Sequence, residues 1–190
     1  MTLAERLVAI HKGLAARDID HAFGGAIALA YWTLDPRGTS DIDVNLFVPS
    51  DDPLPALEAL PEGVAYDDNA VAAIRNEGQV RLWWDETPVD LFFDYADIHA
   101  DAARHRRTVP FAGVEIPVLG PVELAVFKAM FDRTRDWADI EAMLSAQTLD
   151  VDEVRVKLLE LAGDPDERLA RFDEAIRRAD AAGPPARPES

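Results

Sequence analysis

Residues 41–48 read Asp41-Ile42-Asp43-Val44-Asn45-Leu46-Phe47-Val48 and alternate between two faces. Side chains two residues apart on a β-strand project to the same side, so this period predicts a strand with one apolar face. Asp41 and Asp43 then share the other face, roughly 6.5–7 Å apart along the strand. Such a pair is costly beside a core without a counter-charge, and carboxylate oxygens are the ligands that Mg²⁺ prefers. The stretch therefore predicts a cation site.

A third carboxylate, Asp90, stands in segment 88–95 among apolar residues, in the run Val89-Asp90-Leu91-Phe92-Phe93. This segment and residues 79–85 have strand composition and are joined by Glu86-Thr87, so we expect a β-hairpin. If the strand of Asp90 lies beside that of Asp41 and Asp43, three carboxylates converge at one end of a sheet. Three acids can hold two metal ions, one activating an attacking oxygen and one bridging phosphates. The alternative is that Asp90 is a strand-edge acid facing water.

The pair Gly24-Gly25 follows a short strand candidate, residues 19–23, and precedes residues 26–34, whose composition favours a helix. Glycines at this place expose backbone N–H groups at a helix N-terminus, where phosphate binds readily. A lone glycine pair is a weak signal. It becomes a stronger one before a strand that carries Asp41 and Asp43.

The rest of the pattern predicts a mixed α/β section followed by helices alone. In the α/β section we also expect a helix at 3–16, a loop at Asp35-Pro36-Arg37-Gly38, a helix at 97–107 and strands at 108–111 and 114–119. In the helical section the first two helices are expected at 122–131, after Pro121, and at 135–146, with Thr134 as N-cap. The third begins after Asp150 or Asp152 as N-cap and runs to Ala162, where Gly163-Asp164-Pro165 ends it, and the last covers 166–181. We therefore expect an α/β core at 1–120, a helical section at 121–182 and a disordered Pro-rich tail at 183–190.

Composition excludes several classes of function. The chain of 190 residues has no cysteine, which excludes disulfides, thiolate metal sites and cysteine nucleophiles. Residues 1–17 mix charged and apolar side chains, which is unlike a signal peptide, and no apolar run reaches membrane-spanning length. We therefore expect a cytoplasmic protein that does not associate with a membrane. A net charge of −17 opposes broad binding to nucleic acid. It fits a solvated acidic surface or, alternatively, a cationic substrate; we favour the former.

At this point the sequence resembles the DNA polymerase β-type nucleotidyltransferase superfamily. The resemblance rests on His21-Ala22-Phe23-Gly24-Gly25-Ala26, on Arg37-Gly38-Thr39-Ser40-Asp41-Ile42-Asp43-Val44 and on Val89-Asp90-Leu91. A further segment, Leu124-Ala125-Val126-Phe127-Lys128 with Arg133 and Asp136-Trp137-Ala138-Asp139-Ile140, is similar to the AbiEii/AbiGii branch of toxins of type IV toxin–antitoxin systems. The likeness covers about residues 20 to 145. It implies an α/β (α+β) nucleotidyltransferase fold, a mixed β-sheet flanked by helices with an α-helical C-terminal section.

The resemblance also implies roles for the residues that match the motifs. Asp41 and Asp43 correspond to the metal-binding pair and Asp90 to the third acid, a general base or metal ligand, around two Mg²⁺ ions. Gly24 and Gly25 correspond to the loop that holds the triphosphate of an NTP.

Four more positions match polar residues of the family. Lys128 corresponds to a lysine that contacts the triphosphate, and Asp136 to a polar cluster that frames the substrate. Arg37 and Thr39 match an arginine and a hydroxyl residue just before the acid pair, and we count them with the nucleotide-binding residues. One position departs: many members have Ser or Thr where this chain has Ala26, which removes one phosphate contact. The chain is also shorter than many toxins of the branch.

Three functions compete on these grounds. The first is a toxin-like transferase acting on RNA, with an antitoxin protein as a possible partner. The second transfers a nucleoside monophosphate to a small, antibiotic-type molecule, which the net charge of −17 suits because such acceptors are often cationic. The third is a non-catalytic protein that binds a nucleotide or a partner, and the intact acid triad argues against it.

Plainer interpretations exist for several of these residues. Lys128 can be a surface lysine beside an apolar helix stripe, and Arg133 and Asp136 can form an ion pair on a helix surface. The basic run 104–107 can be a solvated helix end. Of the neighbours Trp83 and Trp84, a possible base-stacking platform, alternation puts one ring inside and one outside. The four histidines (His11, His21, His99 and His105) lack metal-ligand spacing, and we expect surface or cap positions for them.

Overall fold

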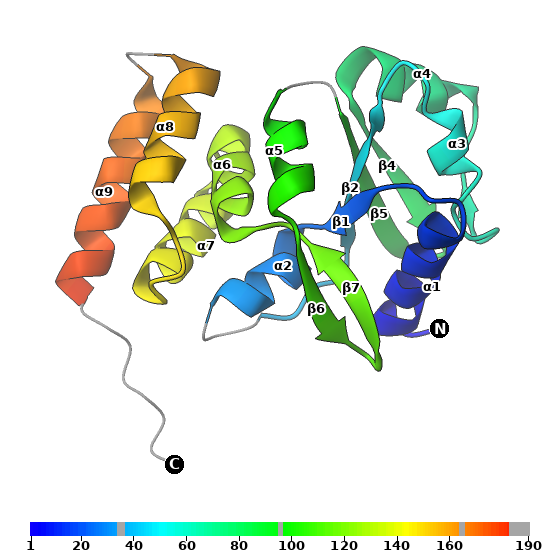
Figure 1. The fold of residues 1–190 in the computed structure, drawn as a ribbon, viewed down its shortest axis with the longest axis horizontal. Helices are drawn as coiled ribbons and strands as arrows, with labels where there is room; N and C mark the ends of the chain where they lie inside the picture. The colour runs from blue at the N-terminus through cyan, green and yellow to red at the C-terminus, as the bar shows by residue number, and fades with distance from the viewer. Residues whose placement is uncertain (34–36, 95–96, 164–165, 183–190) are drawn as a thin grey trace. The chain divides into compact units, whose positions relative to one another are not determined.

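The computed structural model describes residues 1–33, 37–94, 97–163 and 166–182, which form two compact units (Figure 1). Unit 1 consists of Met1–Ile27 and Gly38–Gly120, and unit 2 of Ala28–Arg37 and Pro121–Ser190. Five sequence expectations fall wholly or partly outside the described residues: the tail at 183–190, Leu34 of the expected helix 26–34, Asp35-Pro36 of a loop, Tyr95 of the expected strand 88–95, and Asp164-Pro165 of a helix end.

Unit 1 is built on one mixed sheet, which over the described residues has seven strands in the order β3-β4-β5-β2-β1-β7-β6. The strands are β1 (His21–Phe23), β2 (Ile42–Pro49), β3 (Val64–Ala65), β4 (Gln79–Trp84), β5 (Thr87–Asp94), β6 (Arg107–Phe111) and β7 (Val114–Val118). The pairs β2–β5 and β1–β7 are parallel, and the other neighbours are antiparallel. The expected mixed sheet is thus confirmed.

The alternation that predicted β2 corresponds to a buried and a more exposed face. Ile42, Val44 and Leu46 are fully buried, whereas Asp43 is half-buried. Asn45 shares the face of Asp43 yet is only 4% exposed, because it lies under the backbone of Gly24.

The hairpin β4–β5 turns at Asp85-Glu86, one residue earlier than expected, since Thr87 already pairs with Trp84. Asp85 adopts a left-handed φ of 52°, which an aspartate tolerates in a turn. The two tryptophans divide as alternation predicts: Trp84 is 8% exposed and Trp83 is 52% exposed. Gly63 packs directly on the indole of Trp84, because a Cβ there would lie 2.1 Å from its Nε1.

The helices of unit 1 begin with α1 (Leu3–Ala16), as expected, which carries a capping box between Thr2 and Glu5. The sequence pattern missed three elements: α3 (Leu54–Leu57), β3 and α4 (Asp68–Glu77). Local signals for α4 exist, since Asp67 caps its N-terminus by accepting from Ala70 N–H and Gly78 ends it in a left-handed conformation.

The fifth helix, α5 (Asp97–His105), is shorter than expected, because Arg107 already pairs with Val118 in β6. The expectation that all histidines lie at the surface or in caps is wrong for His21 and His99, which are 5% and 2% exposed. The imidazole of His21 lies on β1, inside the sheet, and its Nε2 is 3.0 Å from Nδ1 of His11.

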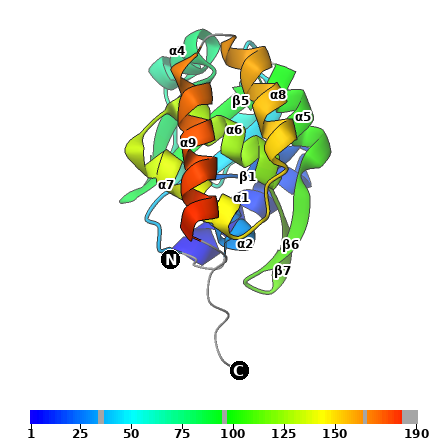
Figure 2. The ribbon, with the colours of Figure 1, turned by 90° about the vertical axis from the view of Figure 1, so that its left-hand side faces the viewer.

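Unit 2 contains α6 (Pro121–Phe131), α7 (Thr134–Ser145), α8 (Val151–Ala162) and α9 (Glu167–Ala182). The helix α2 (Gly25–Trp32) starts in unit 1 and continues in unit 2 from Ala28. Figure 2 shows α8 and α9 side by side, and α7 packs against α9. Asp150 caps α8 as expected, but Thr134 does not cap α7: it is helical itself, and Arg133 occupies the N-cap position, where its side chain makes no capping hydrogen bond.

The helices found in the described residues include none that combines the length and the apolar character needed to cross a membrane.

Candidate active site

Two of the predicted acids are direct neighbours in the sheet of unit 1. The parallel pairing of β2 with β5 sets Asp43 opposite Asp90, so both side chains leave the same face of the sheet. The strand of Asp90 therefore lies beside that of the acid pair, as expected. Its side chain is 15% exposed, which leaves it accessible but partly desolvated.

Arg81 on β4 binds the third acid from the opposite side. The antiparallel register sets Arg81 opposite Asp90, and its Nε and Nη2 donate to the two carboxylate oxygens at 2.7 Å each. These hydrogen bonds, and the charge of Asp90, raise the pKa of Arg81 above its ordinary value. The charges of Asp41 and Asp43 act on Arg81 in the same direction, which places all three acids within its electrostatic reach.

Asp41 stands immediately before β2 and is held by its neighbour Thr39. The hydroxyl of Thr39 donates a hydrogen bond to Oδ1 of Asp41. Asp41 is two residues from Asp43 and half-buried like it. Thr39 thereby fixes the orientation of one of the three carboxylates.

Gly24 and Gly25 lie against the acid pair. The N–H of Gly24 donates to the backbone oxygen of Asp43 at 2.9 Å. Gly25 begins α2 with a φ of 52°, and a Cβ at this residue would stand 1.8 Å from Oδ2 of Asp43. A side chain is excluded at this contact, so glycine is what lets the first turn of α2 approach the carboxylate.

The donor set fits a divalent cation. Asp43 and Asp90 offer hard carboxylate oxygens from one face of the sheet, and Asp41 stands directly before the same strand as Asp43. Carboxylate oxygen is the ligand type that Mg²⁺ takes. The close approach of Gly25 to Asp43 also puts a helix N-terminus next to the acids, where backbone N–H groups favour an anion. A metal ion and a phosphate group can therefore be accommodated side by side.

The other predicted residues, Arg37, Lys128 and Asp136, belong to a charge network within unit 2. The ammonium of Lys128 is 2.6 Å from Oδ2 of Asp139 and 3.7 Å from Oδ1 of Asp136. Arg37 donates to both oxygens of Asp139 at 3.2 and 2.9 Å.

Burial distinguishes this network from surface ion pairs. Lys128 and Asp139 are 5% exposed and Asp136 is 2% exposed, so the interpretation of Lys128 as a surface lysine is wrong. Arg133 forks onto Asp136 with its Nε at 2.6 Å and its Nη2 at 3.2 Å. Burial raises the pKa of Asp139, but hydrogen bonds from Arg37 and Lys128 outweigh it, and the pKa ends below its ordinary value.

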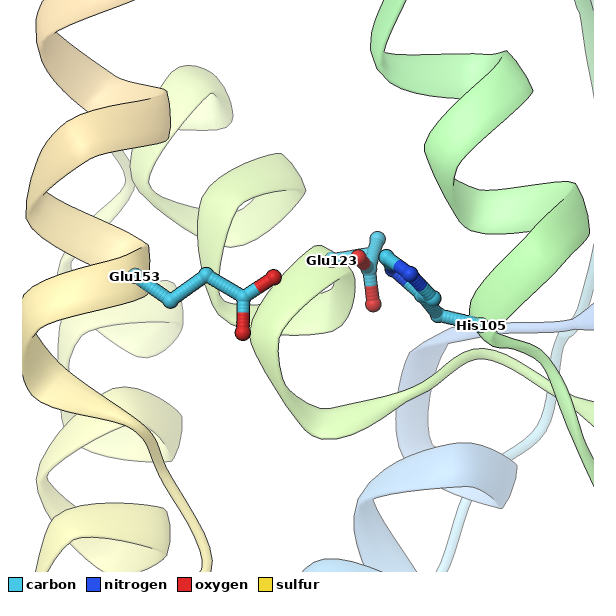
Figure 3. Close-up of side chains that lie close together, drawn as sticks. All are labelled: His105, Glu123 and Glu153. Atoms are coloured by element: carbon cyan, nitrogen blue, oxygen red, sulfur yellow. The ribbon is translucent and has the colours of Figure 1, made fainter.

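A second buried charge cluster links two helices of unit 2. Figure 3 shows Glu153 reaching from α8 toward Glu123 on α6; His105, also drawn, ends α5 of unit 1. Glu123 is 1% exposed, and Nζ of Lys157 lies 4.0 Å from an oxygen of each glutamate. Lys157 is itself only 8% exposed, so it joins α8 to α6 and is no surface lysine.

Sequence reasoning missed Arg81 and gave no separate role to Asp139. A signal for Arg81 exists in the sequence. In a hairpin that turns at Asp85-Glu86, residues at equal distances from the turn on the two strands lie opposite each other, which pairs Arg81 with Asp90. Asp139 follows Asp136 by three residues on α7 and so shares its helix face.

No protein-family profile matches the sequence, and no curated protein does. Solved structures do match. The crystal structure of ANT(2'')-Ia in complex with adenylyl-2''-tobramycin aligns with a TM-score of 0.60 and 12% identity, over 92% of this chain and 98% of that chain. The solution structure of antibiotic-resistance factor ANT(2'')-Ia aligns with a TM-score of 0.51 and 16% identity, over 94% and 93%.

A third match is an antigenic nucleotidyltransferase-like protein from Paracoccidioides brasiliensis, with a TM-score of 0.46 and 14% identity, over 90% of this chain and 92% of that chain. The two ANT(2'')-Ia alignments carry the argument about architecture. At these identities they establish the fold, and the chain has the nucleotidyltransferase fold that the sequence predicted.

Proposed function

We propose that this chain is a Mg²⁺-dependent nucleotidyltransferase that moves a nucleoside monophosphate from an NTP to a hydroxyl acceptor and releases pyrophosphate. The observation that carries the proposal is the lateral pair of Asp43 and Asp90, with Asp41 before the same strand and Gly25 against Asp43. The proposal keeps the cytoplasmic location expected from the sequence, where Mg²⁺ and NTPs are available.

The roles follow from the positions of the side chains. Asp41, Asp43 and Asp90 would hold Mg²⁺, two ions in the form we favour, and the metal would supply charge neutralisation at the reacting phosphate. Gly24 and Gly25 would form the loop that holds the triphosphate at the start of α2. The N–H of Gly24 is bonded to Asp43, so the backbone N–H groups from Gly25 onward would contact the phosphate oxygens. Asp90 would also serve as the general base that accepts the proton of the acceptor hydroxyl. Thr39 holds Asp41 in place.

For the network of unit 2 we propose a role in binding the triphosphate. Lys128 is its central cation, and Arg37 adds a guanidinium that is 30% exposed at its side chain. Three cations (Arg37, Lys128 and Arg133) accompany two carboxylates (Asp136 and Asp139), so the network carries excess positive charge. This excess supports a contact with phosphate through Arg37, whose side chain is more exposed than that of Lys128, with Asp136 holding Arg133 and facing Lys128.

Two classes of acceptor are compatible with the proposed reaction. A small cationic hydroxyl compound is favoured by the net charge of −17 and by the adenylylated antibiotic bound in the ANT(2'')-Ia structure. RNA, with a toxin role of the AbiEii kind and an antitoxin partner, is the second candidate, supported by the Lys128–Asp136 motif that resembles that branch.

The test separates binding from turnover. Mg²⁺ together with an NTP should raise the melting temperature of the wild-type protein, since a ligand that binds the native state stabilises it. Asp43→Asn should remove this shift and lower pyrophosphate release at least a hundredfold, about 2.7 kcal/mol. The matched control is Asp52→Asn, an exposed aspartate on the loop after β2, which should behave as wild type.

Two outcomes would contradict the proposal. One is an unmoved melting curve with all four NTPs and Mg²⁺. The other is an Asp43→Asn variant that keeps the shift and the turnover of the Asp52→Asn control. Labelled NTP supplied with total RNA or with a cationic hydroxyl compound then reports which acceptor takes the nucleotide.

A further inference from the structure

An exposed tryptophan shares the face of the sheet that carries the acids. Trp83 lies two residues from Arg81 on β4, so both side chains leave the same side of the strand. Arg81 hydrogen bonds with Asp90, which fixes that side as the acid face. Trp83 is 52% exposed, the largest exposed fraction among the large hydrophobic side chains of the described strands. A solvent-facing indole beside three carboxylates needs a reason, because Trp84 next to it is buried.

The neighbours of Trp83 leave its ring accessible. On β5 its register partner is Pro88, and on β3 its partner is Ala65. Both partners are small and uncharged, and Ala65 is itself exposed. The indole is therefore a flat apolar surface whose neighbours on both adjacent strands are too small to cover it.

The strand order assigns this surface to one side of the acids. Across the sheet the order is β4, β5, β2 and β1. Trp83 lies on β4, beyond Asp90, whereas Gly24 and Gly25 follow β1, beyond Asp43. If the glycines bind the triphosphate, the donor occupies the β1 side, and the side of β4 is left for the second substrate. This step rests on the function proposed above.

Charge indicates the chemical class of that second substrate. Asp41, Asp43 and Asp90 outweigh Arg81 on this face, and Mg²⁺ and the triphosphate largely cancel each other's charge. The remaining field is negative, so it attracts a cation and repels a phosphate backbone. The face of an indole attracts cations and accepts flat apolar faces.

We propose that Trp83 is the platform on which the acceptor binds, and that the acceptor is a ring-bearing hydroxyl compound with positive charge, such as an amino-sugar oligosaccharide. The ring stacks on the indole, an ammonium group lies over the ring or toward the acids, and a hydroxyl reaches Asp90. Trp83 is thus a specificity-determining residue that distinguishes cationic from anionic acceptors.

Three trisaccharide-sized probes test the class of ligand. These are the glucosamine trimer, which is cationic, the N-acetylglucosamine trimer, which has the same rings without the charge, and a ribotrinucleotide, which is anionic. Each is titrated by calorimetry into the full chain, with and without Mg²⁺ and a non-hydrolysable NTP analogue. In parallel, acrylamide quenching of tryptophan fluorescence is measured on the wild-type protein, where bound ligand should shield Trp83.

The variants are Trp83→Ala, Trp83→Phe and the control Leu54→Ala, an apolar side chain of unit 1 that is 39% exposed. We expect the glucosamine trimer to bind wild type and Leu54→Ala alike, Trp83→Ala at least tenfold more weakly, and Trp83→Phe in between. The neutral trimer should bind at least tenfold more weakly than the cationic one, and the ribotrinucleotide should not shield the fluorescence.

Three results would overturn the proposal. The glucosamine trimer binds Trp83→Ala as tightly as it binds wild type, the ribotrinucleotide shields Trp83 from acrylamide better than the glucosamine trimer does, or no probe shields Trp83 in the wild-type protein. The last readout can be made on the wild-type protein because Trp83 is the most exposed of the four tryptophans and dominates acrylamide quenching. It therefore does not depend on the folding of Trp83→Ala. The melting shift with Mg²⁺ and NTP is recorded on the same samples. Its absence would count against the proposed function, whereas its presence with an unshielded Trp83 would count against the platform alone.

Discussion

The acid face of unit 1 and the charge network of unit 2 hold their carboxylates in opposite ways. Asp43 and Asp90 are half-buried side by side, and their face carries more negative than positive charge. Asp136 and Asp139 are almost fully buried, and cations approach each of them at 2.6 Å. Carboxylates buried against cations stabilise the fold itself, whereas an excess of carboxylates on an accessible face is suited to a ligand.

The largest effect should come from breaking the buried network. Lys128→Met keeps the length of the side chain but leaves Asp139 and Asp136 without the ammonium between them. Removing one partner of a buried ion pair costs about 3–5 kcal/mol, and we expect a loss toward the lower end because Arg37 stays on Asp139. Urea unfolding measures the free energy.

Lys12→Met, at an exposed lysine of α1, is the control for Lys128→Met and should change the free energy of unfolding by less than about 0.5 kcal/mol. Lys157 is unsuitable for this purpose, because it is buried against Glu123. Equal stability of the Lys12 and Lys128 variants would remove the contrast between the two regions. A loss of nucleotide binding without a loss of stability would make Lys128 a ligand contact alone.

The second prediction concerns His21, a buried base of unit 1. Unlike the buried carboxylates of unit 2, its imidazole lies within hydrogen-bond distance of His11 and of the backbone oxygen of Ile19. Burial, together with the charges of His11 and Arg106, lowers the pKa of His21 from its ordinary 6.5 to about 4, and the hydrogen bond to Ile19 and the charge of Asp20 only partly offset this. The folded pKa lies below the unfolded one, so between these values the unfolded state binds more protons. Stability is full above about pH 6.5 and falls as the pH drops toward 4, by up to about 3 kcal/mol.

Urea unfolding at a series of pH values between 4 and 7 measures this loss, and His21→Gln should flatten the profile over that window. His11, whose pKa burial also lowers, contributes in the same direction and should account for what remains. A wild-type profile that is flat from pH 7 to pH 4.5 would show that His21 takes up its proton in the folded state without cost.

A smaller effect is expected at the glycine that borders the acids. Gly25→Ala brings a Cβ into Oδ2 of Asp43 and strains a left-handed φ, so we expect a loss of about 2 kcal/mol and weaker Mn²⁺ binding. Gly113→Ala has a φ of 83° with nothing within 4 Å of the added Cβ, and therefore measures the strain alone. Melting curves and Mn²⁺ titrations that coincide for the two variants would argue against a contact with the carboxylate.

The smallest effect should come from Arg81. Arg81→Gln releases both oxygens of Asp90 and removes a positive charge from the acid face, so Mn²⁺ should bind about tenfold more tightly, a change of about 1.4 kcal/mol. Mn²⁺ titration followed by electron paramagnetic resonance measures this. Arg75→Gln, on the exposed side of α4, serves as the comparison and should leave the affinity unchanged. Weaker binding in Arg81→Gln would mean that Arg81 orients Asp90 for the metal instead of competing with it.

Much of the fold could be predicted because its signals are local. Alternation located β2, strand composition indicated β4 and β5, and helical spacing gave α1 with its observed limits. The pairing of β2 with β5 was a condition of the metal-site hypothesis, and the structure meets it. The short elements α3 and β3 could not be found, since two to four residues carry no readable period and are held by their neighbours.

For the candidate site, residue types were readable but environments were not. The sequence identified Asp43 and Asp90 from their place in apolar strands. It could not reveal that Lys128 is buried, because helix periodicity places a residue at the margin of a stripe without saying what covers it. Arg81 escaped notice for a similar reason: its meaning depends on where the hairpin turns, and the turn lies one residue from the expected place.

The parallel pairing of β2 with β5 bears on how the protein folds. Asp43 and Asp90 become neighbours only after a long crossover that contains α3, β3, α4 and β4 has been closed. Contacts of such sequence separation are slow to form, since chain entropy is lost before they are gained. No fragment with a single one of these strands can assemble the acid pair. A divalent cation should therefore act mainly as a lock on the finished fold, slowing unfolding far more than it speeds folding, as is general for interactions that are absent from the transition state.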